Sequence, residues 1–98
     1  MTPADILSAL GHPNRLHIIE CLADGPKCNC EIAPVLGLEQ SNLSRHLSHL
    51  VKSGLLVAER QGTRVNFALA DRQILRIVEL AERVAKAGVK RMFRDHAA

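Results

Sequence analysis

The stretch from Glu39 to Leu50 constrains this chain most, because its residues sort onto two opposite faces of one predicted helix. Leu43, Leu47 and Leu50 recur at the spacing i, i+4, i+7 and form an apolar stripe. The opposite stripe is polar and contains Asn42, Arg45, His46 and His49, with Gln40, Ser41 and Ser44 at its start. Amide, guanidinium and imidazole groups can pair with base edges and phosphates in a DNA major groove. A polar stripe alone also fits a solvated helix face, so the neighbouring segments decide its role.

The segments on either side of this stretch predict a helix-turn-helix followed by a wing. A short helix ends at Leu36, and because Pro34 is tolerated only near a first turn, we expect it to start close to Cys30 after irregular backbone. A tight connection over residues 37–39 then leads into the two-faced helix described above, which runs to about residue 52. A glycine cap follows, then strands over residues 55–60 and 64–69. The basic hairpin that they form is expected to lie against DNA as a wing.

The remaining helices are predicted at the two ends of the chain. Thr2, Pro3 and Asp5 mark a helix start before a short apolar face, and residues 14–23 form a second helix. Asp71 opens a last helix that runs to about Phe93, with an apolar stripe of Ile74, Ile77, Val78, Ala81, Val84, Ala85 and Met92. A helix of about 20 residues spans about 30 Å, which is longer than a small winged-helix core can cover.

The fold expected from these elements is mostly α-helical with a small β-hairpin wing. Residues 1–98 should form a single winged helix-turn-helix domain that both binds DNA and dimerises. The surplus stripe of the last helix, beside the first helix, should face a second subunit.

Composition excludes several classes of function. The chain of 98 residues has no Trp or Tyr and only two Phe, so aromatic platforms for single-stranded nucleic acid or RNA are poorly supported. The net charge of +3 permits a polyanionic partner. No run of residues predicts a membrane span or a signal peptide, and three Cys fit no secreted disulfide framework, so we expect a cytoplasmic protein with reduced thiols. No nucleophile, base and orienting group occur together in a motif, which argues against an enzyme.

Three parts of the chain resemble the ArsR/SmtB family of winged-helix repressors. They are the run Gln40 to Leu47, its continuation through residues 50–56 and 60–67, and the start Ala9-Leu10-Gly11-His12-Pro13-Asn14-Arg15-Leu16. The likeness covers roughly residues 6–93. It implies a homodimer that sits on double-stranded operator DNA, blocks transcription and is released when an inducer binds.

The resemblance also implies which residues contact DNA. They are Gln40, Ser41, Asn42, Ser44, Arg45 and His46 on the reading helix, and Arg60, Thr63 and Arg64 in the wing. Arg45 suits a guanine edge or a phosphate, and Asn42 or Gln40 suits an adenine edge. Ser41 is also expected to cap its helix. His46 has an alternative role, in which it bonds a neighbouring backbone carbonyl and braces the helix.

Cys28 and Cys30 are the candidate inducer ligands, because thiolates bind zinc, cadmium, lead and trivalent arsenic. On a regular helix the two side chains would lie about 200° apart, so they can share an ion only where the helix starts at or after them, or where its first turn opens. In the family, a Cys-x-Cys pair at this place is a metal or metalloid site. We therefore expect arsenite or antimonite as inducer, or a soft divalent ion such as cadmium or lead, and no obligatory cofactor.

The ligand set departs from the family's arsenic sensors, because no third Cys follows Cys30. Cys21 is the possible third ligand, but its spacing from Ile18 favours a core position. Water or an external thiol could complete the site. The last helix has no His before His96, which is expected in a disordered end, so the family's imidazole site there is not predicted.

Two alternatives stay open. The first is a thiol-based repressor of the same fold, in which Cys28 or Cys30 pairs with Cys21 or is persulfidated. A Cys28–Cys30 bond alone is less favoured, because disulfides at this spacing are strained. The second is a structural winged helix with a zinc staple, for which four ligands are hard to find.

Overall fold

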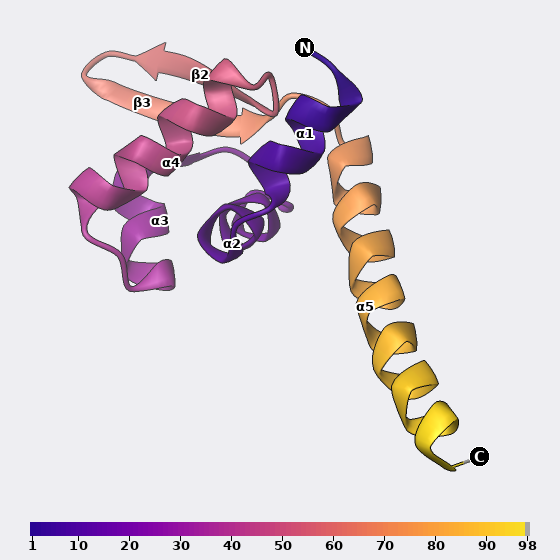
Figure 1. Cartoon of the computed structure of the whole chain (residues 1–98). Coiled ribbons are helices and arrows are strands. Elements are labelled where there is room, and N and C mark those ends of the chain that lie inside the picture. The colour runs from indigo at the N-terminus through magenta and orange to yellow at the C-terminus, as the bar shows by residue number, and fades with distance from the viewer. Residues whose placement is uncertain (98) are drawn as a thin grey trace.

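A computed structural model describes the backbone of residues 1–97 and the side chains of residues 1–92, and its fold is the predicted winged helix-turn-helix (Figure 1). Its elements are α1 (Pro3–Leu10), α2 (Pro13–Cys21), β1 (Lys27–Cys28), α3 (Asn29–Leu36), α4 (Gln40–Lys52), β2 (Leu56–Gln61), β3 (Arg64–Leu69) and α5 (Gln73–Ala97). The predicted order of helices and hairpin strands is confirmed, and α4 matches the stretch from which the prediction began.

Several helix ends form as their residues predict. At the start of α1, the Asp5 amide donates to the Thr2 hydroxyl and the Thr2 amide donates to the Asp5 carboxylate, which is a capping box. Gly37 ends α3 in the left-handed conformation, with φ of 65°, and so allows the sharp turn into α4. At the start of α5, an Asp71 carboxylate oxygen accepts from the Gln73 amide at 2.8 Å, so Asp71 caps the helix from outside it.

Two expectations about helix ends are wrong. Ser41 does not cap α4, because the helix already begins at Gln40 with Glu39 in the cap position. The last helix also continues past Phe93 to Ala97, so its backbone includes His96; the side chains of both residues lie outside the described part.

The sheet has three antiparallel strands in the order β1-β3-β2, whereas the sequence predicted only the hairpin. The added strand is β1, which pairs Lys27 with Phe67 and Cys28 with Asn66. A strand of two residues is too short for a periodic pattern to reveal. Its consequence is that the backbone of Cys28 is joined directly to the wing.

The core lies beneath α4, where Leu43, Leu47 and Leu50 are each at most 1% exposed, as their spacing predicts. They pack in one cluster with Ile18 and Ile19 of α2 and with further apolar side chains of the other helices and β2. The buried stripe of α4 therefore fixes the opposite, polar stripe toward solvent.

Among the described side chains of α5, only those of its first turns join this core, including the buried Ile74 and Val78. Beyond them the helix projects away from the other elements (Figure 1), and the molecule reaches 61 Å along its longest axis. Val84 and Met92, on the stripe predicted to face a second subunit, are 64% and 63% exposed. Among the described residues, no helix combines the length and apolarity that crossing a membrane requires.

Candidate nucleic-acid interface and thiol site

The polar stripe of α4 is accessible, as a surface that reads DNA requires. Gln40, Ser41, Asn42, Ser44 and Arg45 are exposed, while His46 is half-buried. In the wing, Arg60, Thr63 and Arg64 are all exposed around the hairpin turn. The structure thus leaves the predicted contacts on α4 and the wing open to solvent, and their contact with DNA stays a prediction.

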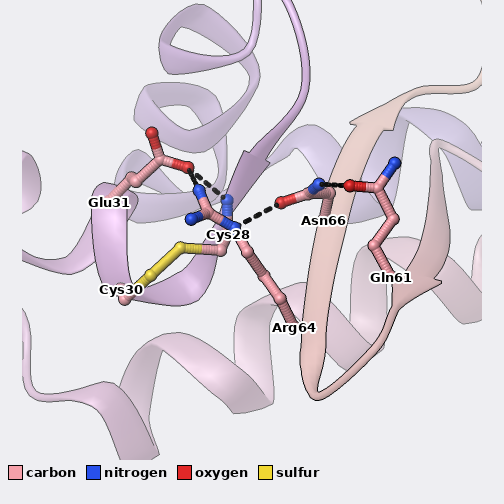
Figure 2. Close-up of a disulfide and its surroundings, with 6 residues drawn as sticks. All are labelled: Cys28, Cys30, Glu31, Gln61, Arg64 and Asn66. Atoms are coloured by element: carbon pink, nitrogen blue, oxygen red, sulfur yellow. Dashed lines mark hydrogen bonds and ion pairs between the residues drawn. A yellow bond between two sulfur atoms is a disulfide. The ribbon is translucent and has the colours of Figure 1, made fainter.

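A polar network ties the wing to the start of α3 (Figure 2). Arg64 forms an ion pair with Glu31, and its Nε donates to the Asn66 side-chain oxygen at 3.1 Å. Asn66 in turn donates to the Gln61 side chain at 3.2 Å. No local sequence pattern predicts the ion pair, because its partners lie 33 residues apart and on different elements. Arg64 is therefore a predicted DNA contact that is already held by a carboxylate.

Glu31 also caps α3, since its Oε1 accepts from the Cys28 amide at 3.1 Å. That hydrogen bond is the largest influence on the Glu31 carboxyl and lowers its pKa below the ordinary value. The nearby Arg64 guanidinium lowers the pKa further, while partial desolvation opposes both effects without reversing them. Glu31 is thus a carboxylate placed between the thiol pair and the wing.

Cys28 and Cys30 are joined by a disulfide (Figure 2), with their Cα atoms 5.2 Å apart. The expectation that such a bond is disfavoured is wrong. Cys28 precedes α3 with extended backbone, at φ −83° and ψ 164°, and Cys30 is the second helical residue. The two side chains therefore do not follow helical spacing, and both sulfurs can meet. The helix start near Cys30, predicted from Pro34, is confirmed to within one residue.

The thiol pair and the predicted DNA-contacting elements line one cleft of about 400 Å³. Its lining comes from the start of α3, from the wing and from α4, which as the second helix of the helix-turn-helix is called the recognition helix. The lining residues are Cys28, Asn29, Cys30, Gln40, Ser44, Thr63, Arg64, Val65 and Phe67. Cys28 is 3% exposed, whereas Cys30 is exposed. The cleft is the place where a ligand of the sulfurs would lie next to groups predicted to contact DNA.

Asn29, between the two cysteines, bonds the recognition helix directly. Its side-chain Nδ2 donates to the Ser44 hydroxyl at 2.7 Å and to the Gln40 backbone carbonyl at 3.4 Å. Sequence reasoning missed this link, because no local pattern connects the side-chain amide at the start of one helix to a hydroxyl 15 residues later on the next helix.

Cys21 does not join the pair. It is half-buried, packs against the core cluster and is not disulfide-bonded, which agrees with the core position that its spacing favoured. Within the described part of the chain, no three Cys, His, Asp or Glu side chains gather in a way that could hold a metal ion. The two sulfurs thus fit a thiophilic ligand only with outside donors.

The ring of His46 packs against that of His12, just before α2, with centroids 4.6 Å apart and planes tilted by 49°, and this neighbour was not predicted. His12 itself caps α2, because its Nδ1 accepts from the Asn14 amide at 3.1 Å. Through this contact His46 of α4 packs against the residue that caps α2, while its direct contact with DNA stays a prediction.

Protonation of His46 should contribute to the pH dependence of the free energy of unfolding. Burial, and then the charges of His12, Arg15, His49 and Arg45, lower the pKa of its imidazole. The unfolded chain, with a His pKa of about 6.5, therefore binds the proton more readily, so the free energy of unfolding falls as pH drops through that value. We expect His46→Gln to weaken this fall between about pH 7.5 and 5.5 in urea titrations. His17→Gln, which changes an exposed histidine of α2 that is not among these charges, is the control, and an undiminished pH slope in His46→Gln contradicts the prediction.

The fold and the site together define a winged helix-turn-helix DNA-binding regulator. Residues 12–57 match the arsR family of bacterial regulatory proteins. The chain belongs to this ArsR family, as its motifs indicated. It is accordingly a transcriptional regulator and not an enzyme.

Individual relatives agree with this assignment. The chain is 44% identical over 68 residues to the HTH-type transcriptional regulator CmtR of Mycobacterium tuberculosis, covering 69% of this chain and 58% of CmtR. It is 31% identical to a probable mercury resistance operon repressor of Streptomyces lividans, over 86% of this chain and 67% of that one. The solution structure of the homodimeric winged helix-turn-helix DNA-binding domain of Mb0332 from Mycobacterium bovis is 32% identical, with a TM-score of 0.75, over 85% of this chain and 77% of that one.

Proposed function

We propose that this protein is a cytoplasmic transcriptional repressor that leaves its operator when a thiophilic metal or metalloid binds Cys28 and Cys30. The observation that carries the proposal is the shared cleft, in which both sulfurs lie beside Gln40 and Ser44 of α4 and Arg64 of the wing. A ligand of the sulfurs there changes the surroundings of groups that face DNA. Its differential affinity for the free and DNA-bound states is what lowers operator affinity.

The proposed DNA contacts divide into reading and positioning groups. Gln40, Asn42 and Arg45 are assigned to base edges, because their side chains match the donor and acceptor patterns of adenine and guanine. Ser41, Ser44, Arg60, Thr63 and Arg64 are assigned to phosphates. His46 sits at the edge of the surface, half-buried against His12.

A homodimer completes the proposal, with residues 1–98 acting as one DNA-binding and dimerisation domain. Exposed apolar side chains continue along α5, including Leu80, Val84 and Met92, and Leu7 on α1 is 61% exposed. A groove of about 250 Å³ between α1 and α5 is lined almost wholly by apolar side chains. The Mb0332 domain, which is similar over most of its length, is homodimeric. Two copies packed through α1 and α5 would cover these faces and present two recognition helices to one duplex.

Arsenite or antimonite is the inducer we favour, with cadmium or lead as further candidates. Two thiolates form a soft ligand pair, and the open cleft gives water or a small external thiol access to a remaining position. The similarity to a mercury resistance operon repressor supports a soft ion in general. Cys21 is the possible third ligand only if the chain rearranges, because it packs against the core.

The test uses reduced protein and an operator selected from a random duplex pool. Operator affinity is measured by fluorescence anisotropy at fixed salt with and without arsenite or cadmium, for wild type, Cys28→Ser and Cys30→Ser. We expect a loss of affinity of about 5- to 150-fold in wild type, which is typical of allosteric coupling. Cys28→Ser and Cys30→Ser should abolish it. Cys21→Ser is the matched control and keeps it. Unchanged release in both Cys28→Ser and Cys30→Ser overturns the proposal.

A second candidate function is thiol-based sensing, favoured by the disulfide between Cys28 and Cys30. In this reading the two thiols lose two electrons and two protons to a two-electron oxidant and form the S–S bond, or one is persulfidated by a sulfane-sulfur donor. Release of operator by a thiol oxidant without any metal, reversed by dithiothreitol, distinguishes this function from metal sensing.

A further inference from the structure

We propose that Asn29 is the positioning residue that couples the state of the Cys28–Cys30 pair to the recognition helix. The inference rests on the proposed function of the pair as a switch, but it holds for either chemical event that brings the sulfurs together. Asn29 is the single residue between the two cysteines, so any change in the distance between their Cα atoms, which is 5.2 Å in the disulfide-bonded pair, changes the backbone torsions of Asn29. Its side chain reaches from α3 to α4, where it donates to the Ser44 hydroxyl at 2.7 Å.

The contact falls on groups assigned to DNA binding. Ser44 is a proposed phosphate contact, and the Gln40 carbonyl, the second acceptor of Asn29, lies in the first turn of α4. In the structure the sulfurs are joined and the Asn29 bond to Ser44 is made. The closed pair therefore places a competing donor on a hydroxyl that faces the operator. It also fixes the start of α4 against α3.

The arrangement with the two sulfurs joined has an unfavourable feature at Asn29. This feature favours separation of Cys28 and Cys30 when no bond or bridging ion holds them together. The Asn29 side-chain oxygen Oδ1 is buried and finds no hydrogen-bond donor among the described residues. A buried acceptor without a donor is unfavourable relative to one that reaches water. A bond or a bridging ion between Cys28 and Cys30 offsets this cost, and its loss frees Asn29 and with it the Ser44 hydroxyl.

The experiment measures a release factor, which is the operator dissociation constant with the pair closed divided by that with the pair reduced and free. Two agents are used to join the sulfurs of Cys28 and Cys30. Arsenite is added to reduced protein; alternatively diamide, a two-electron thiol oxidant, accepts two electrons and two protons as the S–S bond forms. The variants are Asn29→Ala and Asn29→Asp, the second of which keeps the side-chain shape, removes the N–H donor and suits the first position of a helix. Ser48→Ala, an exposed change on α4, is the control.

We expect a release factor of about 5- to 150-fold in wild type and Ser48→Ala, and less than about threefold in both Asn29 variants. Arsenite binding to the free variants, followed by protection of the thiols from alkylation, should persist. Adding Ser44→Ala to Asn29→Ala should cause no further loss of coupling, because the two side chains act through one hydrogen bond.

The outcomes separate the two proposals. A wild-type release factor near one with both agents overturns the proposed function itself. Normal release in Asn29→Ala and Asn29→Asp, with arsenite bound or the disulfide formed, overturns the role of Asn29 and leaves the proposed function standing. Melting temperatures of all variants identify any that fail to fold, and Asn29→Asp then decides in place of Asn29→Ala.

Discussion

Replacing Arg45 by alanine should weaken operator binding more than any other single change on the DNA-facing surface. Arg45 is exposed on the polar stripe of α4, and nothing in the described side chains ties it to a carboxylate. A bidentate arginine–guanine contact contributes about 1–3 kcal/mol, so two copies in a dimer contribute about 2–6 kcal/mol. Fluorescence anisotropy with the selected operator at fixed salt measures the loss.

The form of the loss identifies the contact. If Arg45 reads a guanine, Arg45→Ala lowers affinity for the operator far more than for random duplex, and specificity relaxes at one base pair in each half-site. If it binds a phosphate instead, both affinities fall together and the salt dependence becomes shallower. Arg76→Ala, which removes an exposed arginine from α5, is the matched control and should leave operator affinity unchanged. Wild-type affinity in Arg45→Ala contradicts the assignment of α4 as the reading helix.

The parts of this fold that the sequence predicts are those determined by local chemistry. The spacing of Leu43, Leu47 and Leu50 located α4 and its two faces, since a helical period fixes which side chains share a side. Thr2 with Asp5 marked the first helix start, because a capping box is complete within four residues. The hairpin followed from two alternating strands around a short turn.

The parts that could not be predicted depend on contacts that exist only after the chain has folded. β1 forms because the segment before α3 meets the exposed edge of β3, and two residues carry no period of their own. The disulfide was disfavoured from spacing alone, but the backbone at Cys28 is extended and not helical. The Asn29–Ser44 hydrogen bond and the Glu31–Arg64 ion pair likewise join residues that no local rule relates. The candidate switch therefore consists of tertiary contacts around a pair that the sequence could identify.

Replacing Leu47 by alanine should destabilise the folded state more than any surface change on the same helix. Leu47 is 1% exposed and lies in the central cluster beneath α4. Removing a buried leucine side chain costs about 2–5 kcal/mol, which combines lost burial with the cavity left behind. This is a large fraction of the roughly 5–15 kcal/mol by which domains are stable. Urea unfolding followed by circular dichroism, at one protein concentration for all variants because dimerisation adds to stability, measures the change.

The comparison of Leu47→Ala with Arg45→Ala separates folding from reading on a single helix. Leu47→Met keeps the volume and should cost less than about 1.5 kcal/mol, and Ser48→Ala should stay within about 0.5 kcal/mol of wild type. Arg45→Ala should likewise leave the unfolding free energy nearly unchanged while operator affinity falls. Leu47→Ala should do the reverse, with operator affinity lost only in proportion to the unfolded fraction and recovered under conditions where the variant is fully folded. If Leu47→Ala were as stable as wild type, α4 would not be anchored by its apolar stripe. The fixed orientation of its polar stripe, on which the proposed reading of DNA depends, would then have no physical basis.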